Sequence, residues 1–202
     1  PRTGFVDRSL IAAYTGGLRP ILCLTKTDLA PAAPFAEQFA DLDLAVVTVS
    51  RDTPIEEVAA LLTGHVTVLL GHSGVGKSTL VNRLVPQADR AIGAVSGVGK
   101  GRHTSTQSVA LPLPGGGWVI DTPGVRSFGL AHIRPDDVML AFSDLGEKIT
   151  DCPRGCGHLG PPADPECALD ALTGPPARRV DAARRLLGAL AEQAVAEQRR
   201  GT

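Results

Sequence analysis

The sequence predicts an α/β fold, a doubly wound and mostly parallel sheet followed by a small helical domain. Over residues 1–140, short apolar runs alternate with segments of helical spacing, a pattern typical of parallel sheets covered by helices. A glycine-rich turn at residues 71–78 joins one apolar run to one helical segment. After residue 140 the alternation stops, and cysteines and prolines become frequent. The 202 residues suffice for one α/β domain, expected at residues 1–140, and a smaller one at residues 141–202.

The individual elements follow from the same periodicities. Short apolar runs predict strands near residues 20–25, 44–50, 65–70, 108–113 and 117–121. Helical spacing between these runs predicts helices near residues 7–15, 34–40, 54–63 and 79–84. Gly115, Gly116 and Gly117 separate the last two strands, so we expect an antiparallel hairpin in an otherwise parallel sheet.

In the second domain a helix is expected from Pro175 to about residue 198. Its apolar stripe consists of Val180, Ala183, Leu187, Leu190, Ala191 and Ala194. Its arginines lie largely off that stripe: Arg178, Arg179, Arg185 and Arg199. For these arginines we favour a solvated face over contact with RNA.

The glycine-rich turn matches the phosphate-binding loop G-x-x-x-x-G-K-[ST] at every fixed position. Its glycines let the backbone curl until successive N–H groups face one concavity at a helix N-terminus. Lys77 can then reach the β- and γ-phosphates, and Ser78 can offer its hydroxyl to Mg²⁺. The strand and helix flanks argue against the alternative, a turn that binds nothing. A nucleoside triphosphate is therefore expected to bind at Gly71, His72, Ser73, Gly74, Val75, Gly76, Lys77, Ser78 and Thr79.

Two further motifs follow this loop. Asp121 ends an apolar run and begins Asp-Thr-Pro-Gly, so its carboxylate can hold the Mg²⁺ shell while the Gly124 N–H senses a γ-phosphate. Residues 93–106 have few apolar anchors, so we expect this segment to be mobile until a bound ligand orders it. A hydroxyl of this segment can close on the Mg²⁺, as in GTPase switches. We take Thr104 as the magnesium ligand and Ser105 as a nucleotide contact, while Thr104, Ser105 and Thr106 all remain candidates for the magnesium.

A fourth motif precedes the other three. It consists of Thr25, Lys26, Thr27 and Asp28, and it resembles the guanine-reading motif Asn-Lys-x-Asp with Thr25 in place of Asn. Asp28 can accept two hydrogen bonds from the N1–H and N2–H₂ edge of guanine, which adenine lacks, while the stem of Lys26 lies along the base. Ser50, at the end of the next strand, is expected to place a backbone N–H on the guanine O6. A plain strand-ending turn is the alternative for this motif.

In ordinary Ras-like GTPases the base-reading motifs follow the phosphate-binding motifs, whereas here they precede them. In this order the sequence resembles the circularly permuted GTPases of ribosome biogenesis, specifically the bacterial ribosome small subunit-dependent GTPase A family. The resemblance covers about residues 7–169 and rests on a Cys/His cluster and on residues 25–28, 71–84, 101–106 and 121–130. It implies a circularly permuted Ras-like P-loop GTPase domain that binds GTP and GDP with Mg²⁺. Permutation is tolerable because all nucleotide loops leave the same edge of one sheet.

The resemblance also implies a function. Such proteins are switches that hydrolyse GTP on the small (30S) ribosomal subunit and its 16S rRNA in late assembly, slowly alone and faster with the subunit. We expect a cytoplasmic protein without a membrane partner, because no apolar run approaches the roughly 20 residues of a membrane span and no signal peptide is present. We also expect a monomer. Two alternatives remain: a metabolic P-loop kinase, and a nucleotide-gated rRNA-binding module with negligible turnover.

Members of this family carry an N-terminal OB-fold barrel, to which nothing in this sequence corresponds. The chain begins at Pro1 without Met, which we interpret as a truncated or trimmed chain with much of the RNA-binding surface outside it. The formal net charge of −1 argues against a generally basic RNA-binding surface in these residues.

Val125 follows Asp-Thr-Pro-Gly where Ras-type enzymes carry the glutamine that orients the attacking water. An apolar side chain cannot perform this role. His103 is the best candidate, since an imidazole can position or deprotonate a water, and the resemblance implies the same role. The alternative is a loop histidine that faces solvent or rRNA. The expected catalytic residues are therefore His103, Lys77 and Thr104.

A cluster of Cys152, Cys156, His158 and Cys167 offers three thiolates and one imidazole. This is a closed tetrahedral set for structural Zn²⁺, and without a signal peptide a metal is favoured over disulfides. Unliganded cysteines are the alternative. Relative to the family spacing, the first gap is one residue shorter and the last three residues longer. Cys23 stands apart in a strand and is expected to be a buried small apolar residue.

Overall fold

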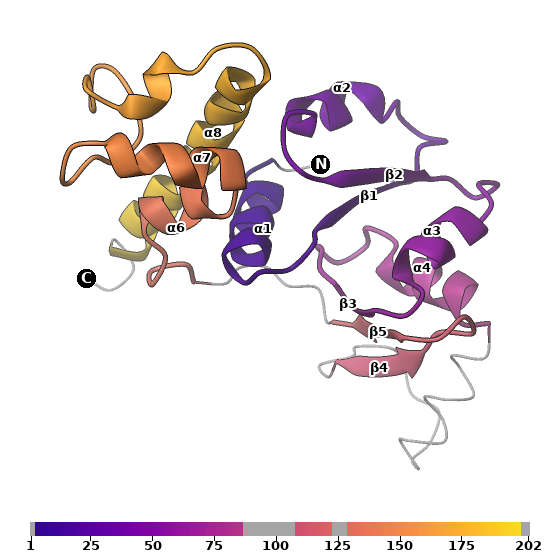
Figure 1. Ribbon diagram of the computed structural model, residues 1–202. Helices are drawn as coiled ribbons and strands as arrows, with labels where there is room; N and C mark the ends of the chain where they lie inside the picture. Colours follow the sequence, from indigo (N-terminus) through magenta and orange to yellow (C-terminus); the bar gives the residue numbers. More distant parts are fainter. Residues whose placement is uncertain (1–2, 87–107, 123–128, 199–202) are drawn as a thin grey trace. The chain divides into compact units, whose positions relative to one another are not determined.

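The computed structural model of this chain describes residues 3–86, 108–122 and 129–198 (Figure 1). The expected strands are present as β1 (Ile21–Thr25), β2 (Ala45–Val49), β3 (Val66–Leu69), β4 (Val109–Pro112) and β5 (Trp118–Asp121). The first half also contains the helices α1 (Thr3–Thr15), α2 (Ala33–Ala36), α3 (Glu56–Leu62) and α4 (Lys77–Leu84), with a 3₁₀ turn, η1 (Glu37–Phe39), after α2. The alternation predicted from the sequence is therefore confirmed.

The strands pair in two groups, β1 with β2 and β3–β5–β4. β3 runs parallel to β5, with Val66 opposite Trp118 and Leu69 opposite Asp121. β4 runs antiparallel to β5, which confirms the predicted hairpin. Among the described strands no pairing joins the two groups, so β3 lies at an edge of its sheet. Because β3 and β5 are parallel and in register, the loops that follow them leave the same end of the sheet.

The second half contains short helices and one long one. These are α6 (Pro135–Leu140), α7 (Ser143–Lys148), the 3₁₀ turns η2 (Ile149–Asp151) and η3 (Ala168–Ala171), and α8 (Pro175–Gln198). α8 has the predicted bounds. Within the described residues, none of the helices has the length and apolarity that crossing a membrane requires.

The chain divides into two compact units. The first comprises residues 1–22, 32–46 and 129–202, and the second comprises residues 23–31 and 47–128. The boundary between the units thus passes through β1 and β2. The division expected from the sequence, a GTPase domain at residues 1–140 and a helical domain at residues 141–202, stays a prediction.

Among its described residues, the second unit has an apolar core formed by β4, β5, α3 and α4. Val119 of β5 is completely buried, and Leu111 lies beside it on β4. From α3 and α4, the buried side chains are Val58, Leu62, Leu80, Val81 and Leu84. This core holds α4 against β5 and thereby fixes where the helix begins.

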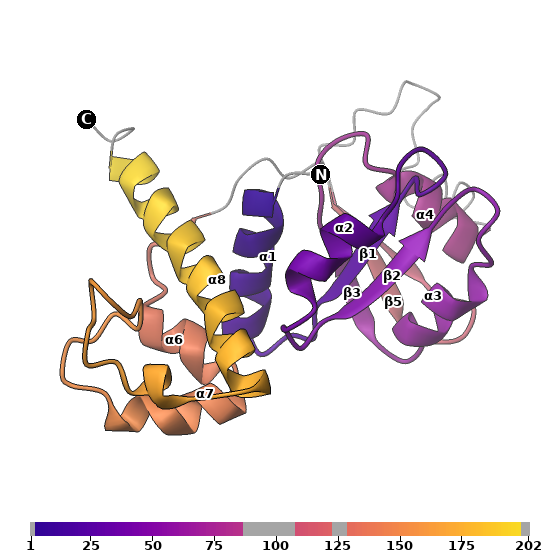
Figure 2. The ribbon, with the colours of Figure 1, turned by 90° about the horizontal axis from the view of Figure 1, so that it is seen from above.

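In the first unit, α8 lies alongside α1 (Figure 2). The predicted stripe on α8 is buried at Val180, Ala183 and Leu187, where Ala182 and Leu186 join it. Farther along α8 the prediction is wrong, because Leu190 is only half-buried while Ala191 and Ala194 are exposed. In this unit α8 contacts α1, α7 and η3, and Ile11, Phe142 and Leu169 are also buried.

Three of the arginines on α8 form ion pairs within the first unit instead of a merely solvated face. Arg178 pairs with Asp41 at 3.1 Å. Arg179 pairs with Asp43 at 2.5 Å and with Asp144 at 3.3 Å. Arg185 pairs with Asp7 at 3.5 Å, and Arg199 lies outside the described residues.

Candidate nucleotide site and metal centre

The glycine-rich loop joins the end of β3 to the start of α4. Gly76 caps the helix with φ +100°, a left-handed conformation that glycine adopts without steric cost. α4 begins at the next residue, Lys77. The amide groups of the loop therefore precede a helix N-terminus, the arrangement that favours an anion.

Lys77 folds back over this loop. Its Nζ donates hydrogen bonds to the carbonyl oxygens of Gly71 at 2.7 Å and His72 at 3.2 Å. The ammonium is thus held beside the backbone that would cradle phosphates. A fixed positive charge at this place suits a polyphosphate ligand.

Ser78 and Asp121 lie close together next to the loop. The Ser78 Oγ donates to Oδ2 of Asp121 at 3.4 Å, while Oδ1 of Asp121 is buried and has no hydrogen-bond partner among the described residues. Thr122 fixes the end of β5 by donating to the Leu69 carbonyl at 2.6 Å. A hydroxyl beside a carboxylate with an unused oxygen fits Mg²⁺, which binds oxygen ligands and retains several waters.

The structure brings the candidate base-reading motif to this loop. Thr25 Oγ1 donates to the Val75 carbonyl at 2.6 Å, and Lys26 Nζ donates to the Gly74 carbonyl at 2.8 Å. Residues about 50 positions apart in the sequence are thereby joined directly. Asp28 is exposed beyond them and is free to meet a ligand.

The turn after β2 is closed by its own side chains. Ser50 N–H donates to Thr53 Oγ1 at 2.8 Å, and Ser50 Oγ accepts from the N–H groups of Asp52 and Thr53 at 3.2 and 3.1 Å. The amide that we expected at the guanine O6 is therefore engaged within the turn in this conformation. Its role in base reading stays a prediction.

The remaining candidates for the nucleotide site lie outside the described residues. They are His103, Thr104, Ser105, Thr106, Gly124 and Val125. Their expected roles in hydrolysis and magnesium binding stay predictions.

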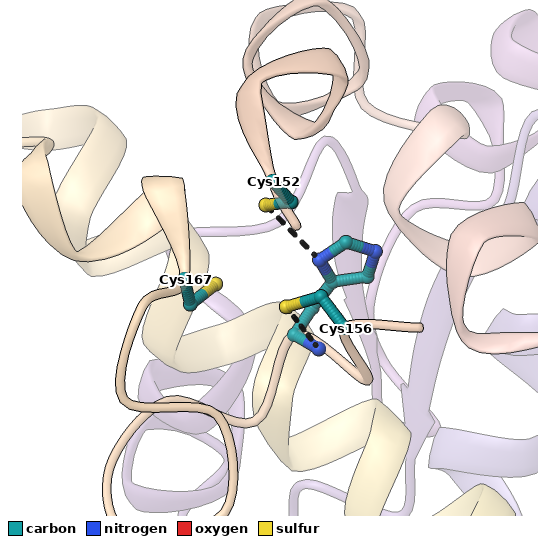
Figure 3. A group of neighbouring side chains, drawn as sticks. Cys152, Cys156 and Cys167 are labelled. Carbon is teal, nitrogen blue, oxygen red and sulfur yellow. Dashed lines mark hydrogen bonds between the residues drawn. The ribbon is translucent and has the colours of Figure 1, made fainter. Parts of the chain in front are cut away.

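The four expected zinc ligands meet in the first unit. One ligand atom from each of Cys152, Cys156, His158 and Cys167 lies within 4.8 Å of the others. Figure 3 shows the sulfur atoms of the three labelled cysteines pointing toward one another. Cys152 Sγ lies 3.6 Å from His158 Nδ1, and ligands about 2.0–2.3 Å from a tetrahedral Zn²⁺ are separated by about 3.5–3.8 Å. The donor set and the distance from Cys152 to His158 therefore fit a metal ion such as zinc, and all four donor atoms lie within 4.8 Å of one another.

A carboxylate supports the histidine of this cluster. His158 is buried, and its Nε2 lies 2.9 Å from Oδ1 of Asp136 on α6. With Nε2 held by the carboxylate, Nδ1 is left to face the cysteines. Metal-binding histidines commonly have such a partner, which fixes the ring and its tautomer.

A guanidinium supports the cluster from α8. Arg184 donates to the carbonyl of His158 at 2.9 Å, to Sγ of Cys167 at 3.6 Å and to Asp170 at 2.7 Å. Gly160 has φ +72°, and a Cβ there would come within 2.8 Å of this guanidinium. A side chain at this position would therefore strain the backbone and displace the guanidinium. A positive charge beside the thiols suits a Cys₃His zinc site, whose ligands carry three negative charges against two on the ion.

Asp164 closes the loop between the ligands. Its two carboxylate oxygens accept from the N–H groups of Gly157 at 3.0 Å and Leu159 at 2.9 Å. These backbone hydrogen bonds hold the pKa of Asp164 below its ordinary value. The segment that carries His158 is thus anchored on both sides of the histidine.

The thiols differ in their surroundings. Burial raises the pKa of Cys156 to about 12, and the neighbouring Cys167 and Cys152 add to the shift. Metal binding must therefore release protons from the cluster. Cys23 belongs to the second unit and is half-buried, so the expectation of a buried residue is wrong. Burial also raises the pKa of the Cys23 thiol.

The sequence did not point to Asp136, Asp164 or Arg184. No local motif marks them, because each acts through a contact that the folded loop creates. The same holds for Arg83, which donates from α4 to the Ser50 carbonyl at 2.9 Å.

A family model described as RsgA GTPase matches residues 1–131. The chain belongs to the RsgA GTPase family. The small ribosomal subunit biogenesis GTPase RsgA of Azotobacter vinelandii is 40% identical over 183 residues, covering 84% of this chain and 51% of that protein. The protein of the same name from Pseudomonas aeruginosa strain LESB58 is 39% identical over 179 residues, covering 84% and 52%.

This RsgA GTPase family chain therefore spans about half the length of the curated relatives it matches. Among solved structures, YloQ, described as a circularly permuted GTPase, matches with a TM-score of 0.62 and 26% identity, covering 95% of this chain and 64% of that one. YjeQ from Thermotoga maritima matches with a TM-score of 0.64 and 24% identity, and the match covers 94% of this chain and 66% of that one. The likeness to YjeQ concerns the fold alone. The fold class and the family predicted from the motif order are confirmed.

Proposed function

We propose that this chain binds GTP and GDP with Mg²⁺, hydrolyses GTP, and acts as a switch on the small ribosomal subunit during late assembly. The observation that carries the proposal is the pair of hydrogen bonds from Thr25 and Lys26 to the carbonyls of Val75 and Gly74. They join a guanine-type motif to a phosphate-binding loop in the permuted order. Membership of the RsgA GTPase family and the names of the relatives support the ribosomal part.

Each part of the nucleotide has a proposed partner. The loop amides and Lys77 bind the phosphates. Ser78, Asp121 and Thr104 hold Mg²⁺, which would neutralise phosphate charge as it develops. Thr25, Lys26, Thr27, Asp28 and the turn at Ser50 bind the guanine. Ser105 and the Gly124 N–H respond to the γ-phosphate.

Guanine selectivity is the first test, because it separates this function from a metabolic kinase. Wild-type protein should bind GTP much more tightly than ATP. Asp28→Asn should weaken the binding of GTP by about 2–4 kcal/mol, since a charged bidentate contact is lost. The same variant should bind xanthosine triphosphate more tightly than wild type does, because the 2-oxo group of xanthine accepts a hydrogen bond from an amide. Unchanged GTP affinity in Asp28→Asn would remove this residue from base reading.

Turnover is the second test, because it separates a GTPase from a nucleotide-gated rRNA-binding module. Hydrolysis should be slow alone, since Val125 cannot orient a water. Small subunits should stimulate a form of the protein that carries an RNA-binding N-terminal domain. In that form His103→Ala should lower the stimulated rate by roughly 10²-fold or more while sparing GTP affinity. Absence of any stimulation would contradict the ribosomal proposal.

We further propose that Cys152, Cys156, His158 and Cys167 hold one structural Zn²⁺. Support comes from the spacing of the four donors and from the carboxylate and guanidinium beside them. Protein prepared without added metal should contain about one zinc per chain by elemental analysis. A zinc content below a tenth of this in folded protein would contradict the site.

The remaining proposals concern organisation and partners. Residues 1–140 would form the GTPase domain and residues 141–202 the zinc-binding domain. The protein would act in the cytoplasm as a monomer and contact 16S rRNA within the small subunit. Sedimentation velocity of the free protein, and crosslinking to subunits in the presence of a non-hydrolysable GTP analogue, would test these points.

A further inference from the structure

Arg83 joins the two halves of the candidate nucleotide site. It lies on α4, the helix that begins at Lys77 of the phosphate-binding loop. Its Nη1 donates to the Ser50 carbonyl at 2.9 Å, and its Nη2 donates to the Thr53 carbonyl. The side chain is half-buried. One guanidinium therefore holds both ends of the turn that follows β2.

The held turn is itself tightly closed. Ser50 and Thr53 exchange hydrogen bonds through their hydroxyls and amides. Asp52 N–H also donates to Ser50 Oγ at 3.2 Å. Since the turn is locked by its own side chains, holding its two carbonyls fixes the whole turn relative to α4. Among the described residues, the two hydrogen bonds from Arg83 are the ones that join the turn to α4.

The chemistry of arginine suits this task. Its planar guanidinium presents several donors in a rigid fork, so that it can bind two carbonyls at once, whereas a lysine offers one point charge. Arg83 lies six residues beyond Lys77, about 9 Å along the helix axis. A movement of the turn relative to α4 would therefore change the distance between the guanine contacts and the phosphate contacts.

We propose that Arg83 is a positioning residue for guanine recognition, which holds the turn at residues 50–53 at a fixed distance from the phosphate-binding loop. The proposal rests on the proposed function as a guanine-nucleotide-binding protein. Thr25 and Lys26 hold the guanine-type motif to the phosphate-binding loop, and Arg83 holds the turn at residues 50–53 to α4. Both segments proposed to bind the base are therefore held in place before any ligand binds. Holding the turn in place increases affinity by lowering the cost of ordering the site. The Ser50 N–H, which donates to Thr53 Oγ1 in this conformation, would then only have to exchange this acceptor for the guanine O6.

The test compares ligands that share phosphates but differ at the base. GDP and 2-aminopurine riboside 5′-diphosphate differ at position 6, where the analogue lacks the oxygen that the turn is proposed to read, and at N1, where it lacks the hydrogen that Asp28 is proposed to bind. Asp28 is the same in all four proteins, so its share of the preference cancels when the proteins are compared. ADP serves as the reference without a guanine edge. Dissociation constants for all three would be measured by calorimetry on the 202-residue chain, for wild type, Arg83→Gln, Arg83→Lys and Asn82→Ala. Asn82 is the exposed neighbour on α4 and provides the matched control.

Wild type and Asn82→Ala should prefer GDP over the 2-aminopurine analogue. In Arg83→Gln, GDP should bind about tenfold more weakly, the effect of losing about one charge-assisted hydrogen bond, and the preference over the analogue should narrow by a similar factor. For Arg83→Lys, the GDP affinity and the preference over the analogue should both lie between those of wild type and Arg83→Gln. General damage to the phosphate-binding loop would weaken the binding of GDP and of the analogue equally, so the ratio of their affinities would not change.

Two results would count against the proposals, and they are distinguishable. If wild type binds GDP no better than ADP, the proposed function fails, and this inference fails with it. If wild type selects GDP but the ratio of GDP to analogue affinity is the same in Arg83→Gln as in Asn82→Ala, the role of Arg83 is overturned and the proposed function stands.

Discussion

The imidazole of His158 lies between a carboxylate and a thiol, with Nε2 2.9 Å from Oδ1 of Asp136 and Nδ1 3.6 Å from Sγ of Cys152. Asp136 belongs to α6, 22 positions earlier in the chain. The histidine thus connects a helix that carries no zinc ligand to the ligand cluster. Any metal held at Nδ1 would be stabilised through this contact, because the carboxylate fixes the ring orientation.

Asp136→Ala should therefore weaken zinc binding by about 10–100-fold, the usual effect of losing such a partner. Asp136→Asn should weaken it less, since the amide oxygen can still accept from Nε2. Zinc affinity would be measured by competition with a chromophoric chelator, and the Co²⁺ spectrum would report ligand geometry. Asp181→Ala, an exposed position on α8, is the control. Equal zinc affinities for Asp136→Ala and Asp181→Ala would show that the carboxylate does not support the ligand.

The metal centre illustrates which part of a site the sequence can reveal. The four ligands could be identified because cysteine and histidine at short spacing are chemically distinctive. Asp136 and Arg184 could not, since the sequence contains 21 acidic and 20 basic residues without a mark to separate these two. Their roles arise from the loop that folds between them.

Thr25 should contribute to nucleotide affinity although it departs from the usual asparagine. Its hydroxyl donates to the Val75 carbonyl at 2.6 Å, so Thr25→Ala removes one hydrogen bond between the base-reading motif and the phosphate-binding loop. The expected loss is about 1 kcal/mol, or about fivefold in GDP affinity.

Two further variants at this position make the test specific. Thr25→Ser keeps the hydroxyl and should bind GDP like wild type, whereas Thr25→Val keeps the shape and should behave like Thr25→Ala. GDP affinities would be measured by fluorescence with a labelled nucleotide. If Thr25→Val matches wild type, the hydroxyl does not support the loop.

The fold itself was predictable where the signal is local. Strand positions follow from short apolar runs, and α8 has its expected bounds from Pro175 to Gln198. The pairing of strands in two groups was not predictable, because it depends on contacts between distant segments. The end of the apolar stripe on α8 was misjudged for the same reason. Ala191 and Ala194 extend the pattern in the sequence but are exposed in the structure.

Asp7 should make the stability of the first unit depend on pH. It is buried on α1, 3.5 Å from Arg185. Burial raises its pKa above the ordinary 3.8, although Arg185 opposes the shift. With a raised pKa, the contribution of this carboxyl to folding is fully present below about pH 3.8 and is lost as the pH rises through the raised value.

Asp7→Asn removes this dependence. The free energy of unfolding of Asp7→Asn, relative to that of wild type, should therefore increase as the pH rises from 4 to 7. Urea unfolding at several pH values would measure the difference, with Asp181→Asn, at an exposed position on α8, as the control. A relative stability that decreases with pH would mean that the attraction of Arg185 outweighs burial.

Removal of zinc should affect the two units differently. The ligands, Asp136 and Arg184 all belong to the first unit, where the metal would join α6 and α8 through their contacts with His158 and Cys167. The phosphate-binding loop belongs to the second unit, which has its own core around Val119. Metal loss should therefore loosen residues 142–175 and leave nucleotide binding nearly intact.

Hydrogen exchange before and after treatment with a chelator would measure this effect, together with GDP affinity on the same samples. Amides of residues 142–175 should exchange faster without zinc, because structural zinc contributes directly to folding free energy. Amides of α4 and β5 should keep their protection. Cys152→Ser should reproduce the effect of the chelator, whereas Cys23→Ala, which changes a cysteine outside the cluster, should retain zinc and normal protection. If chelation abolishes GDP binding as well, the stability of the nucleotide site depends on the metal centre and the two units do not fold independently.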